Sequence, residues 1–216
     1  MIRLIIQPNG RQVPPDHRGG SEVSSSRQAE IVAAAIALFQ EKGYHATSMQ
    51  DIANAVGLQK GSLYHYITGK QDLLAMIYQG VISQYNNRLS EIRQLPLPAG
   101  QRIEMAIRQH IRIIAEHLGM LTIFLRESYA LSPGQRALVQ AEISRYNQMF
   151  EELYAEGVQS GEVRDLDPKL VTRTVLGACN WLYRWYRPDG KRSIDELADF
   201  MVDVLLNGIR VGPPAA

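Results

Sequence analysis

The chain has 216 residues, of which 45% are hydrophobic and 21% are charged, a composition typical of a globular protein that forms a core without disulfides or structural metals. Its 23 Lys and Arg residues nearly balance 22 Asp and Glu residues, which excludes a polybasic protein but not one with a small local patch for nucleic acid. The single cysteine, Cys179, excludes an intrachain disulfide. The apolar runs are too short for a membrane span or a signal peptide, so we expect a cytoplasmic protein.

The first 23 residues contain three prolines and three glycines and show little apolar periodicity. This composition is typical of a segment without regular structure. We expect a flexible arm over residues 1–23. It is either a leader without function or an arm that contacts DNA through Arg3, Arg11 or Arg18.

A helical pattern begins near Ser24. Apolar residues then recur at positions 31, 34, 35, 38 and 39, which share one face of a helix. Gly43 is expected to end this helix, because glycine readily adopts the left-handed conformation found at helix C-termini.

Three further helices follow at short intervals. They are expected to cover residues 48–56, 60–66 and 70 to about 89. Thr47 and Gln50 are predicted to form a capping box at the start of the second helix. Gly57 ends that helix, and its turn requires a residue that tolerates positive φ.

The segment LPLPAG at residues 95–100 breaks the helical pattern and is expected to divide the chain into domains. Beyond it, helical patterns cover residues 101–117, 121–131, 134–156, 168–187 and 194–209. They are separated by Gly119 and by helix breakers at 132–134, 157–161 and 187–190. No alternating strand pattern occurs, so the sequence predicts an all-α fold.

The second and third helices, joined at Gly57, have the spacing of a helix-turn-helix. Small residues at 53 and 57 allow the two helices to approach at a steep angle, and Ile52, Val56 and Leu63 supply the apolar contacts. The third helix carries Lys, Ser, His and Tyr side chains, which suit contacts with phosphates and base edges.

The run DIANAVGLQKGSLYHY at residues 51–66 is preceded by Phe39, Gly43, Tyr44 and Thr47 and followed by Lys70 and Leu73. With these residues, the whole segment 27–78 closely resembles, without gaps, the N-terminal DNA-binding domain of the TetR family of bacterial transcriptional regulators. The resemblance covers about a quarter of the chain and is far more specific than a generic helix-turn-helix.

The resemblance implies a homodimer in which a small N-terminal domain binds double-stranded operator DNA and a larger helical domain binds an effector. The DNA contacts that it implies fall on Thr47, Ser48, Gln59, Lys60, Ser62, Tyr64, His65, Tyr66 and Lys70. Two residues depart from the family pattern. Gln59 stands where Ser or Thr usually caps the third helix, so a looser start is expected, and Ile67 replaces a usual Phe in the packing.

The last two helices are apolar over more than one face, as expected of elements that pack against both their own core and a partner. By resemblance they form the dimer interface. The residues implied are Val171, Val175, Ala178, Leu182, Leu197, Met201, Val204 and Leu205.

The end of the chain resembles TetR members that control fatty-acid, aromatic or steroid catabolism and respond to acyl-CoA thioesters. The effector is therefore expected to be a small molecule such as an acyl-CoA. The ligand-binding residues proposed from the sequence are Met105, His117, Phe124, Arg126, Tyr129, Phe150, Arg184 and Arg187. Alternative roles remain for all of them: the apolar and aromatic side chains also suit a filled core, and the arginines also suit surface ion pairs.

The expected domains are a DNA-binding domain over 24–70, a connecting helix over 71–94 and an effector-binding and dimerisation domain over 95–216. No phosphate-binding glycine loop or nucleophile elbow occurs, and His110 and His117 lie about 10 Å apart along a helix, too far to share one Zn²⁺. We therefore expect no enzyme, cofactor or metal. Two alternatives remain: a DNA-binding regulator without an effector, and a small-molecule binding protein whose DNA domain is not functional.

Overall fold

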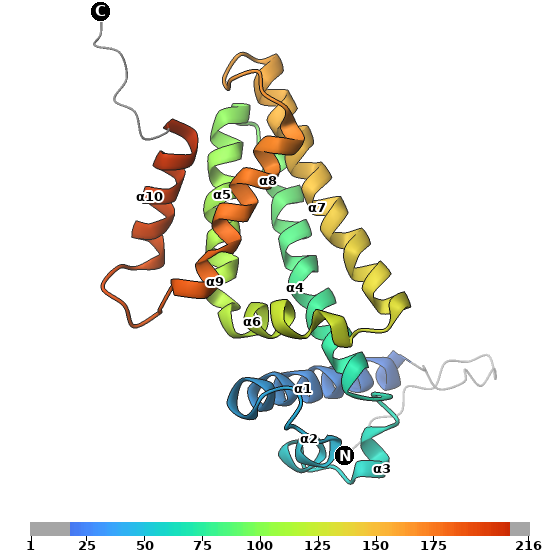
Figure 1. Cartoon of the computed structure of the whole chain (residues 1–216). Coiled ribbons are helices and arrows are strands. Elements are labelled where there is room, and N and C mark those ends of the chain that lie inside the picture. Colours follow the sequence, from blue (N-terminus) through green and yellow to red (C-terminus); the bar gives the residue numbers. More distant parts are fainter. Residues whose placement is uncertain (1–17, 208–216) are drawn as a thin grey trace, which may run out of the picture.

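A computed structural model describes residues 18–207, together with the side chains of residues 26–123 and 127–207. Within this range all regular structure is helical, which confirms the all-α prediction (Figure 1). The helices are α1 (Arg18–Lys42), α2 (Met49–Ala55), α3 (Lys60–Leu63), α4 (Lys70–Arg93), α5 (Ala99–Glu116), α6 (Leu118–Glu127), the 3-10 turn η1 (Ser128–Ala130), α7 (Pro133–Gln159), α8 (Pro168–Asn180), α9 (Leu182–Trp185) and α10 (Ile194–Asn207).

The first helix begins earlier than predicted. Residues 18–23 belong to α1, so they are not part of an arm, whereas the rest of the expected arm, with Arg3 and Arg11, lies outside the described residues. The predicted stop is confirmed, because α1 ends at Lys42 and Gly43 has a φ of +87°. Only glycine adopts this backbone conformation without steric cost.

The chain forms two hydrophobic cores. One joins α1, α2 and α3 through buried residues such as Ile31, Ile52 and Leu63, and it also takes in the N-terminal half of α4 and Ile123 of α6. The second lies among α4, α5, α7, α8 and α10 and contains Ile107. The connecting helix expected over 71–94 corresponds to α4, which contributes to both cores (Figure 1).

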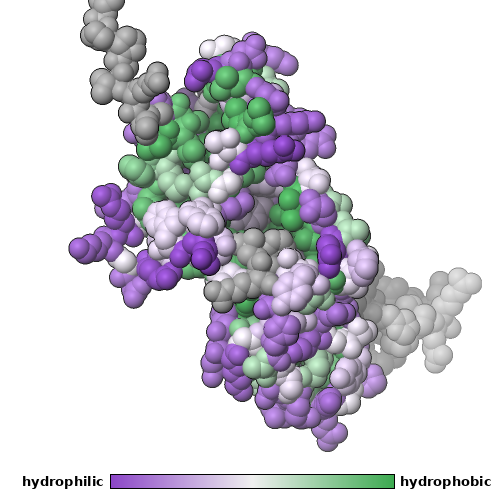
Figure 2. All heavy atoms as spheres, viewed as in Figure 1, coloured by the Kyte–Doolittle hydropathy of each residue, from purple (hydrophilic) through white to green (hydrophobic). Residues whose placement is uncertain are grey.

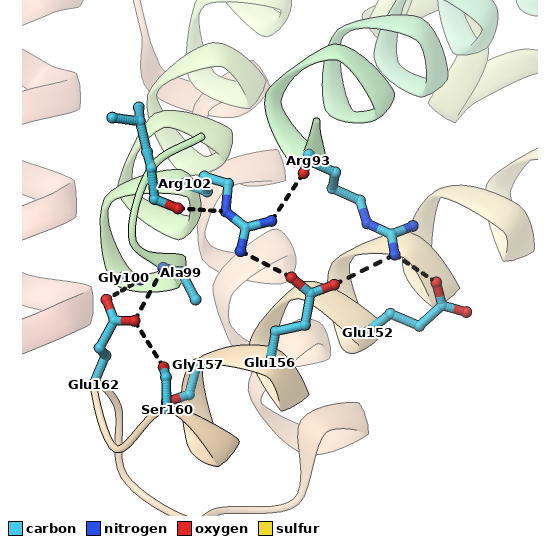
Figure 3. A network of polar contacts seen from close by, with 10 residues as sticks. Arg93, Ala99, Gly100, Arg102, Glu152, Glu156, Gly157, Ser160 and Glu162 are labelled. Atoms are coloured by element: carbon cyan, nitrogen blue, oxygen red, sulfur yellow. Dashed lines mark hydrogen bonds and ion pairs between the residues drawn. The ribbon is translucent and has the colours of Figure 1, made fainter. Parts of the chain in front are cut away.

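A polar network closes the end of the larger domain farthest from α1 (Figure 3). Arg93 of α4 lies 2.9 Å from the Glu152 carboxylate of α7, and Arg102 of α5 lies 2.9 Å from that of Glu156. Glu162, in the loop after α7, accepts hydrogen bonds from the backbone N–H groups at the start of α5, at Ala99 (3.1 Å) and Gly100 (2.9 Å). Glu162 therefore caps α5, whose own N-cap residue is a proline without a capping side chain.

Three predicted helix boundaries in the second half of the chain were wrong. The break expected at Gly119 falls at His117, and Gly119 instead lies within α6 close to the side chain of Gln40 on α1. The segment expected to run from 121 to 131 ends as a 3-10 turn. The segment expected over 168–187 is divided at Trp181 into α8 and α9.

Candidate nucleic-acid interface and effector cavity

The α2–α3 unit has the packing that the sequence predicts. Ile52, Ala53 and Leu63 are fully buried. The backbone N–H of Leu58 donates to the carbonyl oxygen of Ala53 at 2.8 Å, and Gly57 has a φ of +66° in the turn between the helices. The turn is therefore held by both the backbone and the core, and it fixes the direction of α3.

The polar side chains of α3 (Lys60–Leu63), of its N-cap Gln59 and of the turn after it face outward. Gln59, Lys60 and His65 are exposed and Tyr64 is 46% exposed, whereas Ser62 and Tyr66 are half-buried. Gln59 is the N-cap residue of α3 and makes no capping hydrogen bond through its side chain, as its departure from the family pattern implied. A row of hydrogen-bonding side chains on a short, firmly seated helix is the arrangement that major-groove recognition requires.

The predicted capping box at α2 is shifted by one residue. The N-cap is Ser48, whose hydroxyl accepts from the Asp51 backbone N–H at 3.1 Å, while the Asp51 carboxylate accepts from the Ser48 backbone N–H at 2.8 Å. The hydrogen bond from the Ser48 side chain lowers the pKa of Asp51 below its usual value. The prediction of Thr47 and Gln50 was therefore wrong.

Thr47 is also not placed to contact a phosphate through its side chain. It is 1% exposed, and its hydroxyl is directed at the carbonyl oxygens of Gly43 (2.8 Å) and Leu38 (3.2 Å). Its role is to close the turn between α1 and α2.

Lys70 likewise has an internal role that the sequence did not reveal. Its ammonium donates to the carbonyl oxygens of Tyr44 (2.8 Å) and His45 (3.3 Å) and lies 4.7 Å from the centre of the Tyr44 ring. Burial lowers the pKa of Lys70, and the charge of Glu127 opposes that shift. Lys70 thus fastens the start of α4 to the turn after α1, so we do not retain it as a phosphate clamp.

The same turn is tied to the larger domain. His45 Nε2 lies 2.9 Å from the Glu127 carboxylate at the end of α6 and 3.2 Å from the hydroxyl of Tyr129 in η1. Close by, Gln135 of α7 donates to the carboxylate of Asp72 in α4 at 2.8 Å. These contacts join the end of α6, η1 and the start of α7 to the turn after α1 and to α4.

A cavity of about 140 Å³ lies inside the larger domain, and we call it the central cavity. Its lining comes from α4, α5, α6, α7 and α8 and consists of Tyr78, Val81, Ile82, Tyr85, His110, Met120, Leu121, Val139, Ile143, Tyr146, Asn147, Leu176 and Asn180. None of these side chains carries a formal charge at neutral pH, because burial lowers the pKa of His110 to about 4.

His110 is the buried middle member of a row of three hydrogen-bonded side chains. Its Nε2 lies 3.1 Å from the Asn180 side-chain oxygen and its Nδ1 lies 3.0 Å from the Tyr146 hydroxyl. An amide oxygen only accepts, so Nε2 of the neutral ring carries the hydrogen and Nδ1 accepts from Tyr146. This row fixes one wall of the central cavity.

The ligand residues proposed from the sequence do not line this cavity, insofar as their side chains are described. Met105 is exposed on α5, His117 pairs with Gln84 at 2.8 Å, and Phe150 is core. Tyr129 lies at the domain junction, and Arg184 and Arg187 are exposed around α9. The side chains of Phe124 and Arg126 are not among those that the structure describes.

Sequence reasoning missed several of the residues that do line it. Tyr85, Asn147 and Asn180 carry polar groups at positions that helical spacing places among apolar neighbours. A polar side chain among apolar neighbours was the feature of the sequence that could have indicated the cavity, since a polar group inside a core needs a hydrogen-bond partner.

An apolar face covers α8, α9 and α10, and we call it the α8–α10 face. Figure 2 shows hydrophobic side chains gathered over α8 and α10 in the upper part of the molecule. The exposed members of the face are Leu170, Ala178, Trp181, Trp185, Phe200 and Leu206.

Some predicted interface residues lie elsewhere. Val175, Leu182 and Leu197 are buried in the protomer's own core, which leaves little of their surface for a partner. Ala178 is exposed, and partial exposure leaves four others available to a partner, namely Val171, Met201, Val204 and Leu205. Helical spacing did not distinguish the inner side of these helices from their outer side.

A helix-turn-helix on a small core, coupled by a shared helix to a helical domain with an apolar cavity, defines a ligand-responsive DNA-binding regulator. Residues 31–77 match the family model described as bacterial regulatory proteins, tetR family, and residues 96–209 match the model described as tetracyclin repressor-like, C-terminal domain. The chain belongs to the TetR family.

Individual relatives agree with this assignment. The HTH-type transcriptional repressor KstR2 of Rhodococcus jostii is 27% identical over 198 residues, which are 91% of this chain and 96% of that protein. A TetR/AcrR-family transcriptional regulator from Thermobifida fusca is 38% identical with a TM-score of 0.75, covering 86% of this chain and all of that one. AibR, solved in complex with isovaleryl coenzyme A and operator DNA, is 30% identical with a TM-score of 0.74, covering 83% of this chain and 98% of that one.

No helix in the described part of the chain is both long and apolar enough to cross a membrane.

Proposed function

We propose that this protein is a dimeric transcriptional repressor of the cytoplasm that binds a two-fold operator through α3 and is released from it by an acyl-CoA thioester. Its role is regulatory rather than catalytic. The observation that carries the proposal is the combination of an outward polar row on α3 with an uncharged central cavity, joined by α4.

The DNA contacts are assigned to the exposed side chains of α3. Lys60 is the cation of this row and meets a backbone phosphate, while Tyr64 and His65 reach phosphates and base edges. Ser62 and Tyr66 contribute from half-buried positions, and Gln59 is exposed at the start of the helix. Ser48 lies at the N-terminus of α2, where free backbone N–H groups favour a phosphate.

The dimer is assigned to the α8–α10 face. Two recognition helices must lie about 34 Å apart to meet successive major grooves, and a dimer supplies this spacing. A contiguous exposed apolar patch is the usual mark of a surface that a partner covers. Trp181 and Trp185 have the size and polar edge that interfaces favour at their centre.

The effector class is assigned from similarity to a solved relative and from the chemistry of the central cavity. AibR, solved with isovaleryl coenzyme A, covers most of this chain's length, and the central cavity is apolar enough to take an acyl group. The cavity is too small for the nucleotide of coenzyme A, which would lie outside it. Binding inside the larger domain reaches the DNA-binding domain through α4 and through the contact of His45 with Glu127.

The test measures binding to DNA from upstream of the protein's own gene, by fluorescence anisotropy, with and without isovaleryl-CoA. Tyr64→Ala is expected to weaken binding at least tenfold and to leave the dimer intact in sedimentation. Lys60→Ala is expected to lower the dependence of log K on log salt by about 0.9 for each phosphate that the variant no longer neutralises. Lys169→Ala, an equally charged change at an exposed position on α8, is the matched control and should bind as the parent does.

Two outcomes would contradict the proposal. Wild-type protein that fails to retain this DNA at any salt concentration would favour a small-molecule binding protein. DNA binding that no acyl-CoA alters would favour a regulator without an effector.

A further inference from the structure

The size of the central cavity limits what it holds. Its volume is about 140 Å³, and a protein cavity of about 150 Å³ accommodates one benzene molecule. A group of about six heavy atoms therefore fits, whereas a fused ring system or a long acyl chain does not.

The charge of the cavity limits its occupant further. Among the side chains that the structure describes, none that lines the cavity is a lysine, arginine, aspartate or glutamate, and His110 is neutral at physiological pH because burial lowers its pKa to about 4. A carboxylate in this cavity would lose its water shell and gain no cation in return. The occupant is accordingly an uncharged group.

One polar atom in the cavity wall has no partner among the described residues. Tyr85 is only 6% exposed, yet its hydroxyl makes no hydrogen bond within the described part of the chain. Its ring packs against His110, with centroids 4.8 Å apart, and edge-on against Tyr146 at 5.5 Å. The ring is thus held in place, and the hydroxyl is free to meet a ligand that enters the cavity.

The neighbouring polar groups are engaged with one another. The Tyr146 hydroxyl donates to His110, and the other nitrogen of His110 donates to Asn180. Tyr85 contacts two members of this row through its ring without joining their hydrogen bonds. These hydrogen bonds and ring contacts therefore position Tyr85 and leave its hydroxyl available to a ligand.

We propose that Tyr85 is a specificity-determining residue that donates a hydrogen bond to the carbonyl oxygen of a short acyl thioester, so that the central cavity accepts the thioester and rejects the free acid. This inference rests on the proposed function for the identity of the effector as a thioester. A thioester carbonyl is a neutral acceptor, whereas the corresponding acid is ionised at neutral pH and brings an uncompensated charge.

The experiment compares ligands that differ in one property each, by isothermal titration calorimetry on the full-length protein. Isovaleryl-CoA is the complete effector, and its comparison with palmitoyl-CoA tests the length of the acyl chain. The S-methyl thioester of isovaleric acid is compared with isovalerate, which tests the effect of charge in the absence of the coenzyme. We expect isovaleryl-CoA to bind more tightly than palmitoyl-CoA. We expect the S-methyl thioester to bind at least tenfold more tightly than isovalerate.

The variant Tyr85→Phe removes only the hydroxyl oxygen. It is expected to weaken the binding of isovaleryl-CoA and of the S-methyl thioester about tenfold, the effect of removing one hydrogen bond. Its unfolding without ligand should be unchanged, because the hydroxyl contacts no described protein group. Tyr154→Phe is the control: that hydroxyl donates to the Arg164 carbonyl oxygen at 2.7 Å outside the cavity, so stability should fall while affinity stays.

The outcomes separate the two proposals. Four results would each overturn this inference. Tyr85→Phe and wild type bind the thioesters equally, or the S-methyl thioester and isovalerate bind equally. Alternatively, palmitoyl-CoA binds more tightly than isovaleryl-CoA, or no probe binds. If the S-methyl thioester binds through Tyr85 but isovaleryl-CoA does not release the DNA, the inference stands and the proposed effector fails.

Discussion

The imidazole of His110 shows how burial sets the properties of a single residue. Burial lowers its pKa to about 4, and the hydrogen bond with Asn180 opposes this shift. An unfolded histidine has a pKa of about 6.5. Between these values the unfolded chain binds more protons than the folded one. The contribution of His110 to the free energy of unfolding is therefore fully present above pH 6.5 and is lost as the pH falls towards 4.

We therefore expect the free energy of unfolding to fall by about 2 kcal/mol between pH 7 and pH 5 through His110 alone. Urea denaturation at the two pH values measures it. His110→Gln should lack this component, whereas His117→Gln, on the same helix but only half-buried, should keep it. A His110→Gln protein with the wild-type difference would show that another group titrates.

Residue roles were predictable from the sequence only where they depend on local pattern. The positive φ at Gly57 and the weak cap at Gln59 follow from neighbouring residues and were confirmed. Thr47 and Ser48 both have a hydroxyl that could cap α2. The Thr47 hydroxyl donates to the Gly43 carbonyl oxygen in the preceding turn, so Ser48 is the N-cap. Lys70 is paired with carbonyl groups some 25 residues earlier, an interaction that no local pattern contains.

At the scale of elements, α4 is the structural link between the two domains. Its N-terminal half is buried against α1, and residues from Tyr85 to Ile92 are buried in the core of the larger domain. Gly80 lies between these two parts, is exposed, and has open space where a Cβ would be. Glycine inside a helix is less favourable than alanine by about 1 kcal/mol.

Gly80→Ala is therefore expected to raise the free energy of unfolding by about 1 kcal/mol. Gly161→Ala is the matched comparison, since it also meets open space but lies at a φ of +72°, and it should lower stability instead. Chemical denaturation of the two variants beside the parent measures both changes. If Gly80→Ala were destabilising, α4 would have to depart from helical geometry at that position.

The order of the helices followed from apolar periodicity, but several of their ends and the division of the 168–187 segment did not. A glycine ends a helix where the chain must turn, as at Gly43, yet it also lies inside a helix where another element approaches closely, as Gly119 does beside Gln40. The sequence signal is the same in the two cases. The packing partner, which lies far away in the sequence, decides between them.

The whole molecule contains a large apolar face that its own fold leaves uncovered. Phe200 on α10 and Leu138 on α7 are each 59% exposed, but only Phe200 lies on the α8–α10 face. A charge placed on an apolar interface weakens association because it must be desolvated without a partner. The same charge on an exposed surface has little effect.

We expect Phe200→Glu to dissociate the dimer and Leu138→Glu to leave it intact, as measured by sedimentation velocity over a range of concentrations. Operator affinity should fall with Phe200→Glu for the same reason, since one protomer reads half of the site. A Phe200→Glu protein that stays dimeric would place the interface on another face.

The polar network of Figure 3 and the attachment of Lys70 lie at opposite ends of α4, and together they make this helix a lever. At 1.5 Å per residue, Tyr85 is about 12 Å from Arg93 and Lys70 is about 35 Å from it. If α4 pivots at its Arg93 end, Lys70 moves about three times as far as Tyr85. A displacement of about 1 Å at Tyr85 then becomes about 3 Å at Lys70. That exceeds the tolerance of a hydrogen bond to a base edge, and two protomers moving in opposite senses double it. If α4 pivots in this way, a ligand as small as the central cavity admits is sufficient to change the spacing of the two recognition helices.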